Sequence, residues 1–276
     1  MTIARRTLIL SALTLALAGN FANAAKDPKE IVIGTSAGPY ADQIKLGIKP
    51  ILEKQGYKIK LVEFNDYVQP NFALAEGSLD ANVFQHIVYL NKFASEHKLA
   101  LTDLVTIPTA PIAIYSKKHK SLNEVKDGST VGVPNDPSNE ARALVLLDQL
   151  GWIKLRANFD PVRASEKDIV GNPKKIKLVA LEAAQLPRSL GDTDYSFING
   201  NYALAAGIKL TEALIAEKIS ANYINLVAIR SADKNKQFAK DLAAAYRSQA
   251  FLDVTNQHFA GYSKTDEQLA LEKAKK

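Results

Sequence analysis

Short apolar runs in this chain, typical of buried β-strands, are repeatedly followed by polar motifs. Four such motifs occur: Asn65-Asp66-Tyr67, Gln85-His86, Asn135-Asp136-Pro137-Ser138-Asn139 and Ile198-Asn199-Gly200. In an open α/β sheet, ligands bind in the crevice beyond the carboxyl ends of the strands. The pattern therefore predicts an α/β fold in which distant parts of the sequence meet at one polar pocket.

The first 24 residues have the pattern of a secretory signal peptide. Arg5 and Arg6 form a basic start, and residues 8–18 are apolar but too few to span a bilayer. Ala22-Asn23-Ala24 has the small residues of a cleavage site. We expect cleavage after Ala24 and export of the remaining chain; an uncleaved membrane anchor is the alternative.

Composition excludes several kinds of chemistry. The chain contains no cysteine, so disulfides, thiolate nucleophiles and cysteine-based metal sites are excluded. Lys and Arg number 35 against 29 acidic side chains, and removal of Arg5 and Arg6 with the signal leaves 33 against 29, a formal net charge of +4. Because the basic side chains are scattered along the sequence, we interpret them as a solvated surface and expect no nucleic acid partner.

The first half of the chain alternates between strand-like and helix-like patterns. Strands are predicted at residues 31–33, 58–64 and 79–84, and helices at residues 44–52, 68–76 and 87–97. In the first of these helices, Ile44, Ile48 and Ile51 recur at helical spacing. This β-α-β-α-β-α order favours a parallel sheet that is covered by helices on both faces.

The pattern changes at residues 105–115, an apolar extended stretch interrupted by Pro108 and Pro111. Proline disfavours a helix interior and a central strand, so this stretch is interpreted as a crossing between lobes. A second α/β unit follows, with strands predicted at residues 130–133, 176–181 and 194–197 and helices at residues 137–150 and 201–207. Residues 223–229 are apolar again and are interpreted as the return crossing, and the C-terminal segment is helical.

Two crossings of this kind predict a two-lobed α/β fold that closes on a ligand about a hinge. Lobe 1 comprises residues 25–110 and 227–276, and lobe 2 comprises residues 111–226 with the hinge crossings. A single continuous doubly wound domain is the alternative.

A receptor for a carboxylate is predicted at the start of the helix at residues 137–150. Asp136 is a good N-cap and Pro137 a good first residue, so free N–H groups and partial positive charge gather there, beside Asn139. Arg142 lies in the next turn, and its guanidinium can hold a carboxylate through two hydrogen bonds. The alternative is an ordinary capped helix with a surface arginine.

Aromatic and amide side chains follow the other strands. Tyr67, Phe84, His86 and Tyr89 can form an apolar wall, which suits a thioether in particular. The amides of Asn199, Asn201 and Asn225 can pair with an ammonium or a carboxylate group. Core packing for the aromatic residues and turn formation for Asn199 are the alternatives.

Motifs of the common enzyme classes are absent from the sequence. It has no G-x-S-x-G elbow, H-E-x-x-H motif, phosphate-binding loop, dinucleotide fingerprint or calcium loop. This favours binding over catalysis, and we expect no catalytic residue, no cofactor and no metal.

Taken together, the motifs resemble those of the NlpA lipoprotein family, the substrate-binding proteins of bacterial methionine ABC importers. The similar runs are residues 64–71, residues 81–86, residues 135–139 with residues 142–144, Ile198-Asn199 with Tyr202-Ala203, and residues 223–226. They stand in the order found in the family and span nearly the whole predicted mature chain.

The resemblance implies a periplasmic binding protein, not an enzyme, that binds a free amino acid, most often methionine. Arg142 would take the ligand carboxylate, and Asn225 the amino-acid head group with help from Asn199. Tyr67, Phe84, His86 and Tyr89 would enclose the ligand side chain. The partner would be an inner-membrane permease with ATPase subunits, and the protein itself a monomer.

Two departures from the family pattern affect these expectations. Family members usually carry a lipobox cysteine, and its absence here predicts a freely diffusing periplasmic protein without a lipid anchor. The third motif continues with Ile87-Val88-Tyr89, where the family commonly has proline before the tyrosine. This difference affects the local loop shape and the ligand preference. Another hydrophobic amino acid, a methionine derivative or a dipeptide remains an alternative ligand, and an exported amino-acid-modifying enzyme an alternative function.

Overall fold

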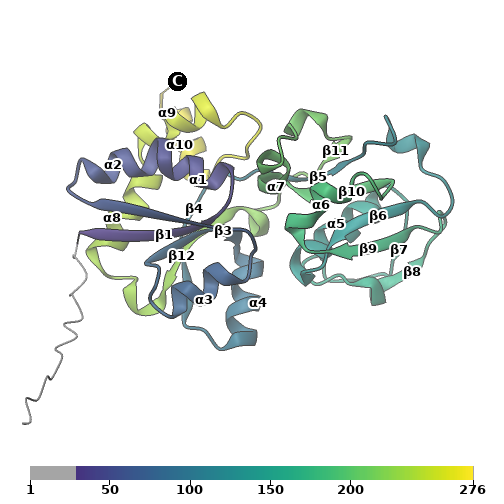
Figure 1. Ribbon diagram of the computed structural model, residues 1–276, viewed down its shortest axis with the longest axis horizontal. Helices are drawn as coiled ribbons and strands as arrows, with labels where there is room; N and C mark the ends of the chain where they lie inside the picture. The colour runs from purple at the N-terminus through teal and green to yellow at the C-terminus, as the bar shows by residue number, and fades with distance from the viewer. Residues whose placement is uncertain (1–28, 276) are drawn as a thin grey trace, which may run out of the picture.

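The structure is a computed structural model in which residues 29–275 are described. The predicted signal peptide, residues 1–24, lies outside these residues. Two lobes lie side by side: the purple N-terminal and yellow C-terminal segments share one lobe, and the teal-to-green middle of the chain forms the other (Figure 1). Each lobe has its own five-stranded sheet, which confirms the predicted two-lobed α/β fold.

The sheet of lobe 1 contains β1 (Glu30–Ser36), β2 (Lys58–Phe64), β3 (Ala81–His86), β4 (Leu101–Thr106) and β12 (Asn225–Arg230), in the order β2-β1-β3-β12-β4. β1, β2 and β3 are parallel, as predicted, whereas β12 is antiparallel to β3 and β4. Residues 223–229, which the sequence predicts to be strand-like and to form the return crossing, therefore contribute most of a strand to the lobe 1 sheet. An apolar run fits a central strand as well as a crossing, so the pattern does not distinguish them.

Helices cover both faces of this sheet (Figure 1). They are α1 (Pro39–Gln43), the π-helical η1 (Ile44–Ile48), α2 (Lys49–Glu53), α3 (Gln69–Ala75), α4 (Ile87–His97), α8 (Gln237–Tyr246), α9 (Gln249–His258) and α10 (Asp266–Ala274). Successive side chains of β1 point to opposite faces. Ile31 and Ile33 are buried in the same cluster as Leu52 of α2, whereas Val32 packs in a cluster with Leu90 of α4. Within residues 29–275, no helix has the length and apolar character needed to cross a membrane.

The sheet of lobe 2 contains β5 (Ile112–Tyr115), β6 (Thr130–Pro134), β9 (Lys177–Leu181), β10 (Tyr195–Asn199) and β11 (Ile215–Ala216), in the order β11-β5-β10-β6-β9. The helices of this lobe are α5 (Pro137–Gln149), α6 (Leu186–Ser189) and α7 (Gly200–Ala205). α5 packs through Leu144 and Leu147 on Val131 and Phe197, while Ile198 faces the cluster formed with α6 and α7.

Shorter elements complete the description. A separate two-stranded sheet pairs β7 (Lys154–Leu155) with β8 (Ile169–Gly171). The single-turn 3₁₀ helices are η2 (Leu122–Glu124), η3 (Glu166–Asp168), η4 (Ala183–Gln185), η5 (Leu210–Glu212), η6 (Ala221–Tyr223) and η7 (Ser231–Asp233).

Gly200 packs tightly against the first crossing. A Cβ at this residue would lie 2.5 Å from the Ala110 Cβ and 2.7 Å from the Pro111 carbonyl oxygen. A larger residue would have to displace backbone, so glycine allows α7 to begin directly against the crossing. This contact places Asn199, the last residue of β10, beside the junction of the lobes.

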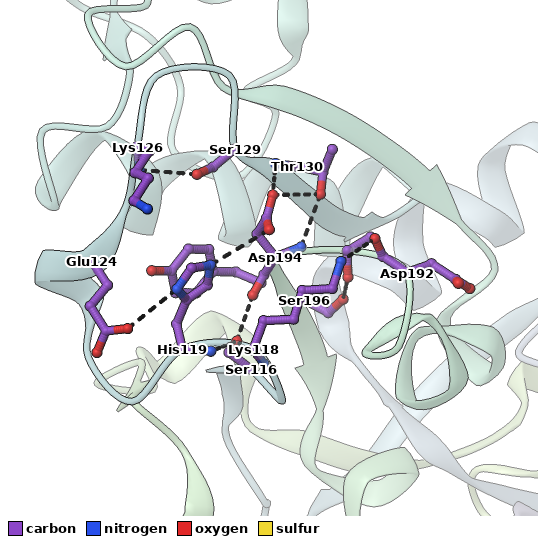
Figure 2. A network of polar contacts seen from close by, with 12 residues as sticks. Ser116, Lys118, His119, Glu124, Lys126, Ser129, Thr130, Asp192, Asp194 and Ser196 are labelled. Carbon is purple, nitrogen blue, oxygen red and sulfur yellow. Dashed lines mark hydrogen bonds and ion pairs between the residues drawn. The ribbon is translucent and has the colours of Figure 1, made fainter.

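A polar network joins the strands at the opposite end of the lobe 2 sheet, where β6 and β10 begin (Figure 2). Asp194 Oδ2 accepts hydrogen bonds from the Thr130 backbone N–H at 2.7 Å and from its hydroxyl at 2.9 Å. Burial favours a higher pKa for Asp194, but the hydrogen bonds from Thr130 and His119 outweigh it, so the pKa of Asp194 is lowered. The ionised carboxylate thus stabilises the pairing of β6 with β10.

Asp194→Ala is expected to lower the free energy of unfolding by about 1–3 kcal/mol at neutral pH, because the Thr130 N–H loses its partner. Urea unfolding measures this change, and Asp192→Ala, at an exposed neighbouring residue, is the control. Since folding lowers the pKa of Asp194, its contribution is present above the unfolded pKa of about 3.9 and is lost as the pH falls through the folded pKa. An equal loss of stability at neutral and strongly acidic pH would contradict this role.

Candidate functional site

A cavity lies between the two lobes, lined by side chains from both of them. All eight predicted site residues line it: Tyr67, Phe84, His86, Tyr89, Asn139, Arg142, Asn199 and Asn225. Tyr67, Phe84, His86 and Tyr89 come from the first segment of lobe 1, and Asn139, Arg142 and Asn199 from lobe 2. Asn225 begins β12, at the end of the return segment. The geometry thus brings together side chains that are distant in the sequence.

Arg142 lies in the second turn of α5 and only 4% of its side chain is exposed. Its Nη1 donates to Asn139 Oδ1 at 2.8 Å, and its Nε donates to Glu217 Oε2 at 3.1 Å. Nη2 also donates to Glu217, and the guanidinium carbon lies 4.8 Å from the centre of the Tyr223 ring. Burial opposes the charged form, but the Glu217 carboxylate outweighs it and raises the pKa of Arg142. The site therefore contains a fixed buried cation.

Asn139 is oriented by the residue that caps α5. The carboxylate of Asp136 accepts from the Asn139 backbone N–H at 3.0 Å, as an N-cap does, and also from Asn139 Nδ2. Because the amide nitrogen faces Asp136, the Oδ1 atom faces the cavity. There it accepts from Arg142 Nη1 and, at 3.0 Å, from Asn199 Nδ2.

His86 is a neutral imidazole in this site. It caps α4, and its Nδ1 accepts the Tyr89 backbone N–H at 3.2 Å. A neutral ring that accepts at Nδ1 carries its proton on Nε2, which lies 3.5 Å from Asn139 Oδ1. Burial, assisted by the charge of Arg142, holds the pKa of His86 well below its usual value.

The opposite wall of the cavity is aromatic. The Tyr67 and Phe84 rings are stacked with their centres 5.5 Å apart, and Tyr89 meets both rings edge-on at 6.0 and 5.9 Å. The Tyr67 hydroxyl donates across the lobes to Asn201 Oδ1 at 2.7 Å, and the Tyr89 hydroxyl donates to the Tyr67 carbonyl at 2.9 Å. Burial raises the pKa of Tyr67 and of Tyr89, so both phenols are neutral. This wall offers an apolar, polarisable surface to a ligand.

Asn225 is held by an irregularity in the lobe 1 sheet. The register between β3 and β12 shifts at Leu226 and Val227, which leaves Phe84 without a directly paired residue. The freed Phe84 carbonyl accepts from Asn225 Nδ2 at 3.0 Å, and the Asn225 backbone N–H donates to Thr109 Oγ1 at 2.8 Å. Bulges of this kind commonly redirect side chains near functional sites.

Asn199 presents an unsatisfied acceptor. Its Nδ2 is used by Asn139, but its Oδ1 is buried and accepts no hydrogen bond within residues 29–275. A buried polar atom of this kind calls for a donor. With the guanidinium of Arg142 nearby, the site offers charged donors for an anionic group and amide acceptors for a cationic one.

Several lining residues were not predicted. Tyr40, Gln85, Thr109 and Ala110 also line the cavity, beside Asn201, which the sequence offers as a candidate amide together with Asn199. Glu217 contacts the guanidinium of Arg142. Gln85 belongs to a motif visible in the sequence, but the sequence pattern does not show that its side chain is buried. Glu217 follows the two-residue strand β11 in an irregular segment, where no sequence pattern marks a role. Within the described residues, no group of three or more His, Cys, Asp or Glu side chains could hold a metal ion.

The sequence and the fold are similar to those of known binding proteins. The sequence profile of the family described as NlpA lipoprotein matches residues 31–266. The D-methionine-binding lipoprotein MetQ of Salmonella typhi is 41% identical over 251 residues, which cover 90% of this chain and 92% of that protein. A solved nutrient binding protein from Burkholderia cenocepacia, bound to methionine, is 43% identical with a TM-score of 0.80, covering 85% of this chain and 99% of that chain.

A solved periplasmic substrate-binding protein of an ABC transporter from Coxiella burnetii is 40% identical, with a TM-score of 0.80 over 85% of this chain and 100% of that chain. All three proteins are described as binding proteins. They confirm the prediction of a substrate-binding protein of an ABC transporter rather than an enzyme. A permease is the partner that such a component requires.

The prediction of a protein without a lipid anchor is contradicted. It was based on the absence of cysteine, but the family and the Salmonella relative are both described as lipoproteins. A cysteine-linked lipid is one of several means of membrane attachment, so its absence did not justify the expectation. The N-terminal residues on which that expectation depended, residues 1–28, lie outside the described part of the chain.

The family match extends over both lobes and includes all of the residues that line the cavity. The relatives share the fold over nearly their whole length. The chain belongs to the NlpA lipoprotein family.

Proposed function

We propose that this protein binds free methionine between its lobes and releases it, chemically unchanged, to the permease of an ABC importer whose ATPase subunits supply the energy. The observation that carries the proposal is the convergence of Arg142 from lobe 2 and an aromatic wall from lobe 1 on one buried cavity. The names of two relatives, one methionine-binding and one bound to methionine, support the choice of ligand.

Each side chain has a role in this proposal. Arg142 binds the ligand carboxylate, because a guanidinium can form two charge-assisted hydrogen bonds with it. The Asn199 Oδ1 atom accepts from the ligand ammonium, and Asn225 contacts the same head group. Asn139 orients Arg142. The aromatic wall, with His86, encloses the thioether, which gains from contact with aromatic rings. The side chains of this wall are Tyr67, Phe84 and Tyr89.

We further propose that the lobes move as two domains, with residues 25–110 and 227–276 in lobe 1 and residues 111–226 in lobe 2. Membership of the two sheets supports this division except at Asn225 and Leu226, which begin β12 of the lobe 1 sheet. The other strands of that sheet fall within residues 30–106 and 227–230, and those of the second sheet within residues 112–216. The proposed unit is a monomer, because one chain supplies the lining of the cavity.

Isothermal titration calorimetry tests the proposal directly. Protein freed of small molecules by unfolding and refolding is titrated with L-methionine, D-methionine, leucine and a methionine-containing dipeptide. We expect 1:1 binding of a methionine enantiomer with a Kd of about 1 μM or below, equivalent to about 8 kcal/mol. Tighter binding of leucine or the dipeptide would assign that compound as the ligand in place of methionine. Millimolar binding of every common amino acid would contradict the proposal.

A further inference from the structure

Glu217 forms an ion pair with Arg142 but is not among the residues that line the cavity. It follows β11 directly, and 11% of its side chain is exposed. Its Oε1 accepts the Ile112 backbone N–H at 3.0 Å, at the point where β5 begins after the first crossing. Oε2 accepts Arg142 Nε at 3.1 Å, and Oε1 pairs with Nη2. One carboxylate therefore connects the start of β5, the end of β11 and the cation of α5.

This contact determines which part of the guanidinium a ligand can reach. An arginine side chain has five N–H donors in a planar fork. The Glu217 carboxylate accepts hydrogen bonds from Nε and Nη2, and Asn139 Oδ1 accepts one from Nη1. One donor on each Nη atom makes no hydrogen bond within residues 29–275. These two donors are enough for a single ligand carboxylate.

Glu217 also sets the charge of the site. Arg142 is the one residue with a formal charge among those described as lining the cavity, since His86 is neutral there. The carboxylate of Glu217 cancels the charge of Arg142 before any ligand enters. An arginine that is already paired with a carboxylate favours a ligand of zero net charge, because an additional unpaired charge is costly to bury.

We propose that Glu217 is a positioning residue that makes the cleft selective for zwitterions, by neutralising Arg142 and leaving two of its N–H donors for a ligand carboxylate. A ligand with a carboxylate but no ammonium group is rejected, because it brings an uncompensated negative charge into the site. This inference depends on the proposed binding of an amino acid at Arg142. It adds a reason why the site prefers ligands that carry both a carboxylate and an ammonium group.

The test compares L-methionine with γ-(methylthio)butyrate, which is methionine without its amino group, by calorimetry. We expect wild-type protein to bind methionine at least about 100-fold more tightly. In Glu217→Gln, which keeps an oxygen acceptor for the Ile112 N–H, this preference is expected to fall at least about tenfold because the site gains net positive charge. Glu182→Gln, at the rim of the cleft where Glu182 accepts from Asn135, is the matched control and should keep the wild-type preference.

The outcomes separate this inference from the proposed function. If Glu217→Gln binds both ligands more weakly by the same factor, the preference is unchanged. That result would show that Glu217 has only a structural role, and it would overturn the inference. If that variant does not fold, the wild-type comparison decides: binding of the two ligands within about tenfold of each other overturns the inference. Failure of wild-type protein to bind either ligand would instead contradict the proposed function.

Discussion

Arg142→Ala is expected to weaken methionine binding by more than about 2 kcal/mol, because the ligand carboxylate loses its charged partner in a buried site. The substitution also leaves Glu217 buried without the cation that it pairs with, so like charge then faces the ligand carboxylate. Both effects act in the same direction, which makes this the largest change that we expect from one substitution. Calorimetric titration with methionine measures it.

Arg163→Ala is the matched control for this experiment. The Arg163 side chain is 83% exposed and pairs only at the surface, with Asp160. Surface pairs contribute about 0–1 kcal/mol to stability, so we expect wild-type affinity in the control. Circular dichroism verifies that Arg142→Ala is folded under the conditions of the titration. Wild-type affinity in folded Arg142→Ala would remove this residue from the binding site.

Asn225→Ala is also expected to weaken methionine binding by more than about 2 kcal/mol. The substitution removes a buried hydrogen-bonding group and the contact that holds Phe84 in place. The Asn225 amide bridges to the Phe84 carbonyl at the bulge in β3. Removing it frees that carbonyl beside the ligand and loosens the position of the Phe84 ring. The loss should therefore be similar for methionine and for other amino acids that the protein binds.

Asn172→Ala provides the comparison. Asn172 also uses its amide locally, since its Nδ2 donates to the Ile176 carbonyl and its Oδ1 accepts the Ile176 N–H. It does not line the cavity. We expect this variant to lose stability by about 1 kcal/mol and to bind methionine as wild type does. Equal affinities in Asn225→Ala and Asn172→Ala would show that the amide of Asn225 does not act in binding.

The sequence predicts the elements of the fold better than their arrangement. The strands at residues 31–33 and 130–133 are recognisable because a buried strand gives a short apolar run bounded by turns, whereas the strand at residues 58–64 largely alternates polar and apolar side chains. The antiparallel position of β12 between β3 and β4 in the lobe 1 sheet is not recognisable. An apolar run such as this one is expected in a buried strand and in a crossing alike. Only its pairing with β3 and β4 shows that it is a strand of the sheet.

The site shows a similar division. Residues at or just after strand ends, such as His86, Asn139 and Asn199, lie together because the strand ends of each sheet face the same crevice. Glu217 could not be predicted, since its role depends on the spatial proximity of an irregular segment to α5. Its carboxylate has no local signature, and the sequence distance of 75 residues from Arg142 hides the pairing.

The most direct test of amino-acid binding in this cleft is a crystal structure of the protein with L-selenomethionine as the added ligand. The chain has a single methionine, Met1, which lies in the predicted signal peptide, so the mature protein contributes no selenium of its own. The account predicts one anomalous selenium peak between the rings of Tyr67, Phe84 and Tyr89, with the ligand carboxylate on Arg142. A fully formed cavity without a selenium peak at saturating ligand, or a peak only at the outer surface, would contradict it.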